Sequence, residues 1–239
     1  MDFLKEKCNT MRVFICCLLV ISALIFSCKE KADKLEVKDI TLTEVDTVNP
    51  PPPPNPPATA LEYLITDTTF GKINKATTYN DLERMFGKNN IQDTINYGAE
   101  GMDSFIVTKI FSNTPKELVI NWQIDKFHNA IATVDCFHDN SWYHTIDSLT
   151  IGSTLQKLVQ VNGKKINFYG TGWDYGGLIT SYNGGKFQRP KIFFSLNSAP
   201  GASEKVMGDR ELNTDMPQVK QNLRKLYISN ISLSLHNER

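Results

Sequence analysis

Two short stretches of the chain place apolar residues at the three- and four-residue spacing of an amphipathic helix. In the stretch 78–88, TYNDLERMFGK, the residues Tyr79, Leu82 and Phe86 share one face. The stretch 154–164, TLQKLVQVNGK, has a similar stripe made by Leu155, Leu158 and Val159. The spacing therefore predicts two short helices that each turn one apolar face toward a core.

The two stretches are related as an internal repeat. Four aligned positions are identical, namely Thr78/Thr154, Leu82/Leu158, Gly87/Gly163 and Lys88/Lys164. The pairs Thr78–Asp81 and Ser153–Gln156 have the spacing of helix N-terminal capping pairs. A glycine ends each helix, where a left-handed residue is most easily glycine.

Extended segments follow each predicted helix. In the first half they are Thr94–Tyr97, Ser104–Phe111, Leu118–Ile124 and Ile131–Phe137. In the second half they are Ile166–Tyr169, Leu178–Tyr182, Lys191–Leu196 and, after a helix begun by Asp215 and Pro217, Leu226–Leu235. The pattern predicts an α+β fold of two tandem, similar halves, each a helix followed by antiparallel sheet. The first half spans 66–140, and the second spans 141–239 with a C-terminal helix and strand.

The N-terminus is predicted to be an export signal. An apolar run of about fifteen residues starts after Arg12, too short for a membrane-spanning helix and suited to a signal peptide over residues 1–27. Its end, Ile25-Phe26-Ser27-Cys28, resembles the lipobox of bacterial lipoproteins, in which the cysteine is lipidated. The alternatives are a plain membrane anchor and an ordinary cleaved signal. Met11 also offers a start for a compact signal peptide, which makes residues 1–10 a candidate upstream extension.

Residues 28–65 are predicted to be the lipidated Cys28 and a tether. The sequence PPPPPNPP at 50–57 favours a stiff polyproline II spacer. Lys29-Glu30-Lys31 resembles the export tag of Bacteroidota lipoproteins that reach the surface of the outer membrane. We therefore expect a protein that is anchored by lipid to the outer membrane. Whether it lies on the periplasmic or on the surface-exposed face stays open.

Charge and cysteine content further limit the kinds of partner and of covalent framework that the chain can have. The chain has a formal net charge of 0, and removal of residues 1–27, which hold three basic and two acidic residues, leaves −1. A near-neutral chain with mixed charges argues against a nucleic-acid partner. The mature chain would retain only Cys28 and Cys136, so it has no intramolecular disulfide framework. The oligomeric state stays open.

The stretch 162–177, NGKKINFYGTGWDYGG, superficially resembles a phosphate-binding glycine loop. A dinucleotide fingerprint requires a third glycine and a following helix, but position 175 is tyrosine and the residues after 177 alternate as a strand does. A glycine-rich bend or bulge between two strands is the preferred interpretation. The sharper hypothesis is a partner-binding surface made by Tyr169, Trp173, Asp174 and Tyr175, with Trp173 either in the core or at the surface.

Other groups of residues give weaker evidence for a metal-binding or catalytic site. His128, Cys136, His138 and His144 have side chains able to ligate zinc, with Cys136 and His138 on one face of a predicted strand. No established ligand spacing is present, so structural histidines are preferred and no metal site is assigned. No serine lies in GxSxG. Asp174, between two aromatic residues, suits a glycosidase acid, although hydrogen bonding to its own turn is the preferred role. We assign no catalytic residue and no cofactor.

Residues of about 140–235 resemble uncharacterised lipoproteins of Bacteroidota that share an NG…F.G.GWD.GG signature. The tandem helix-plus-sheet pattern is similar, at the level of fold, to beta-lactamase inhibitory protein and to the small lipoprotein of the outer-membrane barrel-assembly machinery. These resemblances imply no catalytic residues.

Together these patterns predict a non-catalytic lipoprotein of the cell envelope that binds a protein, peptide or glycan. The first alternative is an envelope hydrolase or metal-dependent enzyme. The second is a structural or assembly lipoprotein of the outer membrane.

Overall fold

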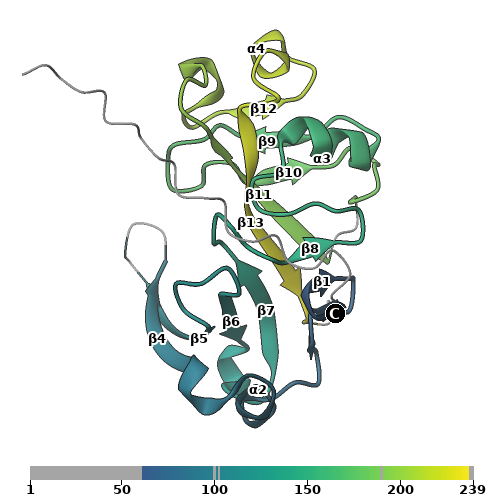
Figure 1. The fold of residues 1–239 in the computed structure, drawn as a ribbon. Helices are drawn as coiled ribbons and strands as arrows, with labels where there is room; N and C mark the ends of the chain where they lie inside the picture. The colour runs from purple at the N-terminus through teal and green to yellow at the C-terminus, as the bar shows by residue number, and fades with distance from the viewer. Residues whose placement is uncertain (1–60, 99–100, 102, 189–190, 237–239) are drawn as a thin grey trace, which may run out of the picture. The chain divides into compact units, whose positions relative to one another are not determined.

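A six-stranded antiparallel sheet, in the order β11-β13-β7-β6-β5-β4, is the main element of the computed structural model (Figure 1). Its strands are β4 Ile91–Tyr97, β5 Ser104–Ile110, β6 Leu118–Trp122, β7 Ile131–Cys136, β11 Ile192–Ser198 and β13 Leu226–Ser234. The structure describes residues 61–98, 101, 103–188 and 191–236, which all lie in one compact unit spanning 51–239. The fold is mixed α+β with few helices, as the sequence predicts.

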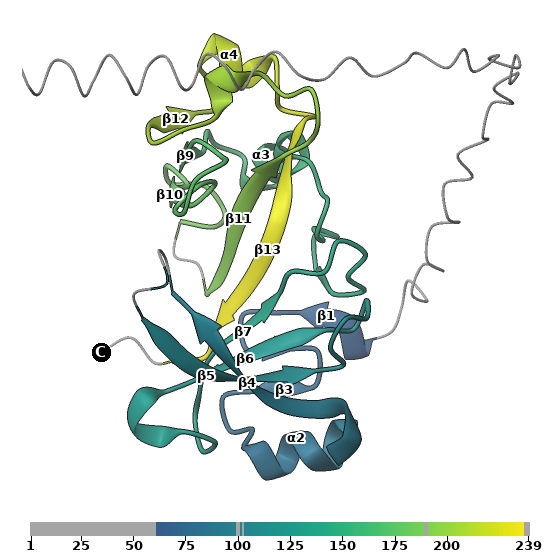
Figure 2. The same cartoon turned by 90° about the vertical axis from the view of Figure 1, so that its left-hand side faces the viewer.

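Two smaller sheets complete the strands. One has the order β3-β2-β1-β8 and joins β1 Leu64–Ile65, β2 Thr69–Phe70, β3 Ile73–Asn74 and β8 His144–Thr145, with β1 and β8 parallel. The other has the order β10-β9-β12 and joins β9 Asn167–Tyr169, β10 Ile179–Ser181 and β12 Glu211–Asn213. Figure 2 shows this second small sheet beside the ends of β11 and β13 that lie away from α2.

The helices are short, and their ends follow local chemistry. They are α2 Tyr79–Phe86, α3 Leu155–Asn162 and α4 Pro217–Lys220, with 3₁₀ turns η1 Leu61–Tyr63, η2 Lys88–Asn90, η4 Ile124–Lys126 and η5 Glu204–Val206. Thr78 caps α2 in a capping box with Asp81, as predicted. Gly87 and Gly163 follow the last residues of α2 and α3, as predicted, but only Gly163 has the expected left-handed conformation, with φ 73° and ψ 1°, whereas Gly87 has φ 83° and ψ 134°.

Two predicted helix starts are displaced by one residue. The N-cap of α3 is Thr154, whose hydroxyl accepts from the amide of Lys157 at 3.3 Å, and not Ser153 paired with Gln156. The Ser153 hydroxyl instead accepts from the Thr150 amide at 3.0 Å. Ser153 and Thr154 are adjacent, so the sequence alone allows either hydroxyl to cap the helix. The surrounding turn determines which of them does. At α4 the N-cap is Met216, so Pro217 is the first helical residue and Asp215 lies outside the helix.

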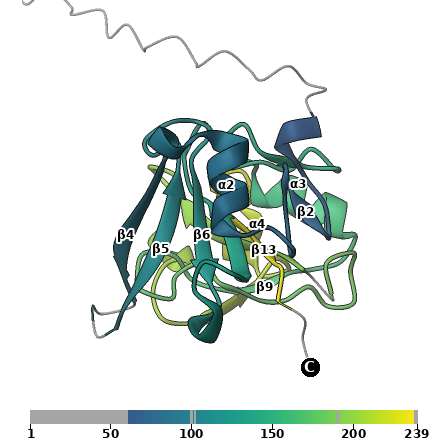
Figure 3. The same ribbon diagram turned by 90° about the horizontal axis from the view of Figure 1, so that it is seen from below.

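Helix α2 covers part of the large sheet on its apolar side. Leu82 is fully buried, and the Tyr79 ring lies 6.4 Å from the Trp122 ring of β6. Figure 3 shows α2 lying over the sheet beside β6. The apolar stripe predicted from the sequence is therefore the face that packs, and burial of such a face is the main source of stability for so short a helix.

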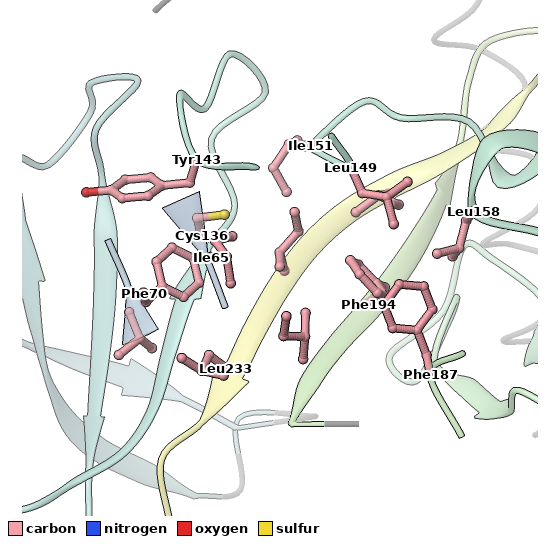
Figure 4. Packing of buried hydrophobic residues seen from close by; sticks show 14 of the residues in the cluster. Ile65, Phe70, Cys136, Tyr143, Leu149, Ile151, Leu158, Phe187, Phe194 and Leu233 are labelled. Atoms are coloured by element: carbon pink, nitrogen blue, oxygen red, sulfur yellow. The ribbon is translucent and has the colours of Figure 1, made fainter. Parts of the chain in front are cut away.

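Strand β13 connects the two predicted halves of the chain. Ile231 pairs with Cys136 of β7 on one side and with Phe194 of β11 on the other. The inward side chains of β13 belong to one continuous hydrophobic cluster that draws on both sequence halves (Figure 4). The two segments thus share one sheet and one core.

Replacement of Ile231 by alanine tests this central position. Ile231 is fully buried, so Ile231→Ala is expected to lower the free energy of unfolding by about 2–5 kcal/mol through lost burial and a residual cavity. Phe193→Ala, at a 42% exposed position on the adjacent strand, is the control and is expected to cost about 1 kcal/mol or less. Equal losses in urea unfolding would contradict the central role of β13.

Candidate functional site

The glycine-rich segment forms a tight turn between β9 and β10. Gly177 has φ +77°, and a Cβ atom there would lie 1.8 Å from the carbonyl oxygen of Leu196. At Gly170 a Cβ would lie 2.5 Å from the carbonyl oxygen of Gly208. These glycines are required because other backbone segments approach them directly. The preferred sequence interpretation, a glycine bend between strands, is therefore confirmed.

Neighbouring segments hold the turn in place. The Leu196 amide donates to the Gly177 carbonyl at 2.9 Å, which joins the turn to β11. Thr171 is buried, and its amide donates to the Val206 carbonyl at 3.1 Å while its carbonyl accepts from the Gly208 amide at 2.9 Å. The Thr171 hydroxyl donates to the Ser198 hydroxyl at 3.0 Å. The turn is thus fixed on two sides by hydrogen bonds.

Three aromatic side chains, which we call the aromatic row, follow this turn: Tyr169, Trp173 and Tyr175. The Tyr169 and Trp173 rings have centroids 5.8 Å apart, the Trp173 and Tyr175 rings 5.5 Å apart, and both pairs are edge-to-face. The Trp173 Nε1 donates to the Gly170 carbonyl at 2.7 Å. Trp173 is half-buried, while Tyr175 is 54% exposed. The open question about Trp173 is resolved as an intermediate position: it is anchored by its nitrogen and reaches the surface.

Asp174 differs from the sequence-based preference. Its side chain is exposed and, among the described residues, accepts no hydrogen bond and forms no ion pair. The amide two residues on, that of Gly176, which such a turn would use, donates instead to the Trp173 carbonyl at 2.8 Å. The carboxylate therefore faces solvent next to the aromatic row.

Further apolar side chains extend this surface. Leu178 is 47% exposed and pairs with Ser195 of β11, while Phe193 is 42% exposed two residues before Ser195. Paired residues and alternate residues of a strand lie on the same face, so Leu178 and Phe193 share one face of the sheet. Sequence reasoning missed both residues because their proximity depends on a bridge between distant segments.

The turn lacks the features of a nucleotide site. Strand β10 follows it, whereas a dinucleotide fingerprint places its glycines at the N-terminus of a helix. Three hollows of about 630, 330 and 100 Å³ occur among the described residues, and the aromatic row lines none of them. The candidate surface presents the exposed side chains of Tyr175, Leu178 and Phe193.

The histidines and cysteine of the candidate zinc cluster are not brought together. The described residues contain no group of three or more metal-ligating side chains. Cys136 ends β7 and is fully buried, and burial raises the pKa of its thiol to about 12. His138 lies beyond the strand, in a turn where its Nδ1 accepts from the Asn140 amide at 3.2 Å, so it does not share a strand face with Cys136. His144 lies on β8 in another sheet.

His128 has a packing role instead. Its ring is stacked between Tyr79 at 4.0 Å and Phe127 at 3.9 Å, measured between centroids. Its Nε2 lies 3.0 Å from a carboxylate oxygen of Asp93, within ion-pair distance but outside hydrogen-bond geometry. Asp93 also accepts from the Thr108 hydroxyl at 2.6 Å. The group fastens the start of α2 to the edge of the sheet.

A buried carboxylate also escaped the sequence reasoning. Asp135 on β7 is 7% exposed, and burial raises the pKa of its side chain, an effect opposed by hydrogen bonds from Ser232, Thr133 and Asn121. These partners come from β6, β7 and β13, so only the strand register reveals the group. It forms a polar cluster within the sheet and lines none of the three hollows.

Comparison with known proteins gives little more. No protein-family model matches the chain, and no curated protein matches it significantly. Among solved structures, the chain is similar to the crystal structure of the uncharacterized protein yfeY from Escherichia coli, at 12% sequence identity and a TM-score of 0.40. That match covers 71% of this chain and 98% of the other.

Cys28 and the proline run at 50–57 lie outside the described residues, which begin at residue 61. The last part of the predicted tether, residues 61–65, is instead part of the fold: it forms η1 and β1, and Tyr63 and Ile65 are buried in the hydrophobic core. Within the described ranges, no helix has the length and apolar character needed to cross a membrane.

Substitution of the turn glycines tests the close approach. Gly177→Ala places a methyl group against the Leu196 carbonyl and is expected to cost about 3 kcal/mol or more, or to prevent folding. Gly152→Ala is the matched control, because Gly152 has a similar φ of +84° and nothing lies within 4 Å of the added atom. Its expected cost of about 1–2 kcal/mol reports backbone strain alone. Thermal unfolding that gave the two variants equal stability would disprove the proposed contact.

Proposed function

We propose that this chain is a non-catalytic lipoprotein of the cell envelope that binds a protein or peptide partner through the aromatic row and Asp174. The observation that supports this most is a turn, fixed by hydrogen bonds, that presents the exposed Tyr175 beside the half-buried Trp173 and Tyr169. Trp173 is held by its bond to Gly170, and Tyr175 rests edge-on against it. Large aromatic side chains that are fixed before binding lose little conformational entropy and dominate many interfaces.

Two features of this surface favour a protein or peptide over a glycan. Leu178 and Phe193 extend the exposed apolar area beyond the aromatic row, as a protein interface requires. The Asp174 carboxylate, unpaired among the described residues, supplies a charge for a basic or hydrogen-bonding group of the partner.

The wider proposal concerns location and ancestry. We infer a signal peptide over residues 1–27, lipidation at Cys28, a spacer that ends before the folded residues begin at Leu61, and attachment to the outer membrane, supported by the lipobox-like and KEK sequences. We further propose that residues 66–140 and 141–239 are tandem halves related to the beta-lactamase inhibitory protein fold. The similar caps of α2 and α3, with threonine before and glycine after each helix, support that relation.

An envelope glycosidase is the second candidate function. Asp174 is the observation that favours it, because a solvent-exposed carboxylate between two aromatic side chains suits a sugar ring. The binding proposal is preferred because glycosidases use a pair of carboxylates, and Asp174 is the only acidic residue of the segment 169–178. An assembly role at the outer membrane is the third proposal and rests on the inferred lipid anchor alone.

Photo-crosslinking tests the proposed surface directly. We expect a photoreactive phenylalanine analogue at position 175 of the full-length chain to form a crosslinked adduct of defined mass in cells that express the protein. The same analogue at Tyr97 is the control, because Tyr97 is 66% exposed on β4, at the opposite edge of the large sheet from β11. Trp173→Phe keeps a ring but loses the bond to Gly170, so it is expected to reduce the adduct about tenfold or less, and Trp173→Ala more strongly.

The identity of the adduct separates the candidate partners. Sensitivity to protease supports the protein or peptide partner, whereas sensitivity to glycosidases alone would replace it with a glycan. Equal yields at positions 175 and 97, or yields unaffected by Trp173→Ala in a folded variant, would remove the aromatic row from the proposal.

Lipidation at Cys28 is tested separately. Metabolic labelling with a radioactive fatty acid is expected to mark the wild-type chain and to leave Cys28→Ser unlabelled, because the thiol is the acceptor. Cys136→Ser is the matched control and should retain the label, since Cys136 is fully buried. Label on Cys28→Ser, or none on the wild type, would contradict the lipoprotein assignment.

A further inference from the structure

A hollow of about 630 Å³ lies beside the C-terminal end of α3, away from the aromatic row. Three basic residues and one acidic residue line it, with two polar and two apolar residues: Lys164, Lys165, Lys220, Asp215, Asn183, Thr214, Val159 and Leu223. The hollow thus joins residues just after α3 to residues in and after α4. We call it the lysine hollow.

Two asparagine side chains fix the backbone that carries the first two lysines. The Asn162 Nδ2 donates to the Lys164 carbonyl at 2.9 Å, and the Asn183 Nδ2 donates to the Lys165 carbonyl at 3.2 Å. Both carbonyl groups at this turn therefore have a partner from the side chain of another residue. Without these hydrogen bonds, only the covalent chain would restrain the backbone of the two consecutive, exposed lysines.

The support behind this turn is tightly packed. Asn162 is 2% exposed, and its amide nitrogen also donates to the Tyr182 carbonyl at 3.0 Å while its oxygen accepts from the Phe187 amide at 3.2 Å. A Cβ atom at Gly185 would lie only 2.3 Å from the Asn162 oxygen. The wall of the hollow is therefore rigid on the side of α3.

The opposite wall of the hollow, which carries Lys220, is hydrogen-bonded to the segment that leads into β9. The Ile166 amide donates to the Thr214 hydroxyl at 3.1 Å, and the Thr214 amide donates to the Ile166 carbonyl at 3.1 Å. These two hydrogen bonds bring Lys220, six residues after Thr214, to the same hollow as Lys165. Three cationic side chains from two segments thus face one space.

The charge of the hollow is incompletely balanced. Lys220 lies 3.8 Å from Asp215, and both side chains are exposed, so this pair contributes little. Among the described residues, Lys164 and Lys165 make no ion pair within 4 Å. The segment 141–239 carries twelve basic and seven acidic residues, a formal charge of +5, against seven and ten, or −3, for 66–140. The near-zero total therefore conceals a basic C-terminal half.

We propose that the lysine hollow binds a phosphate ester, either as a small free molecule or as a lipid headgroup. Ammonium groups act as compact point charges and bind phosphate oxygens by charge-assisted hydrogen bonds. Val159 and Leu223 supply apolar contact for the carbon skeleton attached to the phosphate. The size of the hollow matches a small organic ligand better than a strand of nucleic acid, which would need a longer basic track.

Calorimetric titration of the full-length chain tests this site with sn-glycerol 3-phosphate and with pyrophosphate at low salt. The double variant Lys164→Gln/Lys165→Gln and the single variant Lys220→Gln are expected to weaken binding about tenfold or more and about threefold, respectively. The control is Lys88→Gln/Lys205→Gln, which removes the same charge from exposed positions outside the hollow. Lys88 also occupies the position after α2 that corresponds to Lys164 after α3.

Vesicle co-sedimentation distinguishes the two sources of phosphate. Wild type and variants are compared on phosphatidylglycerol and on phosphatidylcholine vesicles, so that membrane affinity from the N-terminal segment, common to all variants, cancels. Loss of the preference for phosphatidylglycerol in Lys164→Gln/Lys165→Gln supports a headgroup, whereas an effect on glycerol phosphate alone supports a free ligand. Effects in both assays support recognition of the phosphate group itself.

The proposal is overturned if wild type binds neither probe nor prefers the anionic vesicles, or if the control double variant weakens binding as much as Lys164→Gln/Lys165→Gln. Thermal unfolding of each variant verifies that a loss of binding is not a loss of fold. The substituted lysines are exposed, so little change in stability is expected.

Discussion

The pairing of β13 with strands on both sides is the interaction on which the rest of the structure depends. Ile231 faces Cys136 on β7 and Phe194 on β11, and all three side chains are buried. Removal of β13 would separate the strands that follow α2 from those that follow α3 and would expose the centre of the hydrophobic cluster. A late strand that closes an early sheet is a non-local contact, which has a high entropic cost to form.

The register of β13 also shapes the candidate surface. A shift between Ser195 and Leu196 accommodates an extra residue of β13, so that Ile228 and Ile231 both point inward although they are three residues apart. Leu196 then offers its amide to Gly177, and its carbonyl leaves no space for a side chain there. The position of the aromatic row therefore follows from the sheet, and the glycines are the condition for that contact.

Local signals in the sequence predict much of the fold, and long-range contacts account for what they miss. The stripes and capping residues of α2 and α3, and strands of five residues or more, have periodicity that can be recognised. Strands β1, β2, β3 and β8 have two residues each, too few for alternation, and exist because distant segments pair. The choice of Thr154 over Ser153 as the cap, and the lack of a turn bond at Asp174, depend on which amides the surrounding backbone already uses.

The same distinction applies to the two proposed binding regions. The turn glycines and the three side chains of the aromatic row lie close together in the sequence, so the sequence alone identifies them as a candidate site. The lysine hollow combines Lys165 with Lys220, and only the hydrogen bonds between Ile166 and Thr214 bring their segments together. Strand β9 joins the two regions, since Lys165 precedes it and Tyr169 ends it, a separation of about 13 Å at about 3.3 Å per residue. Because β9 is paired on both sides, by β10 and β12, this spacing is fixed, and each region is positioned by the same small sheet without sharing side chains with the other.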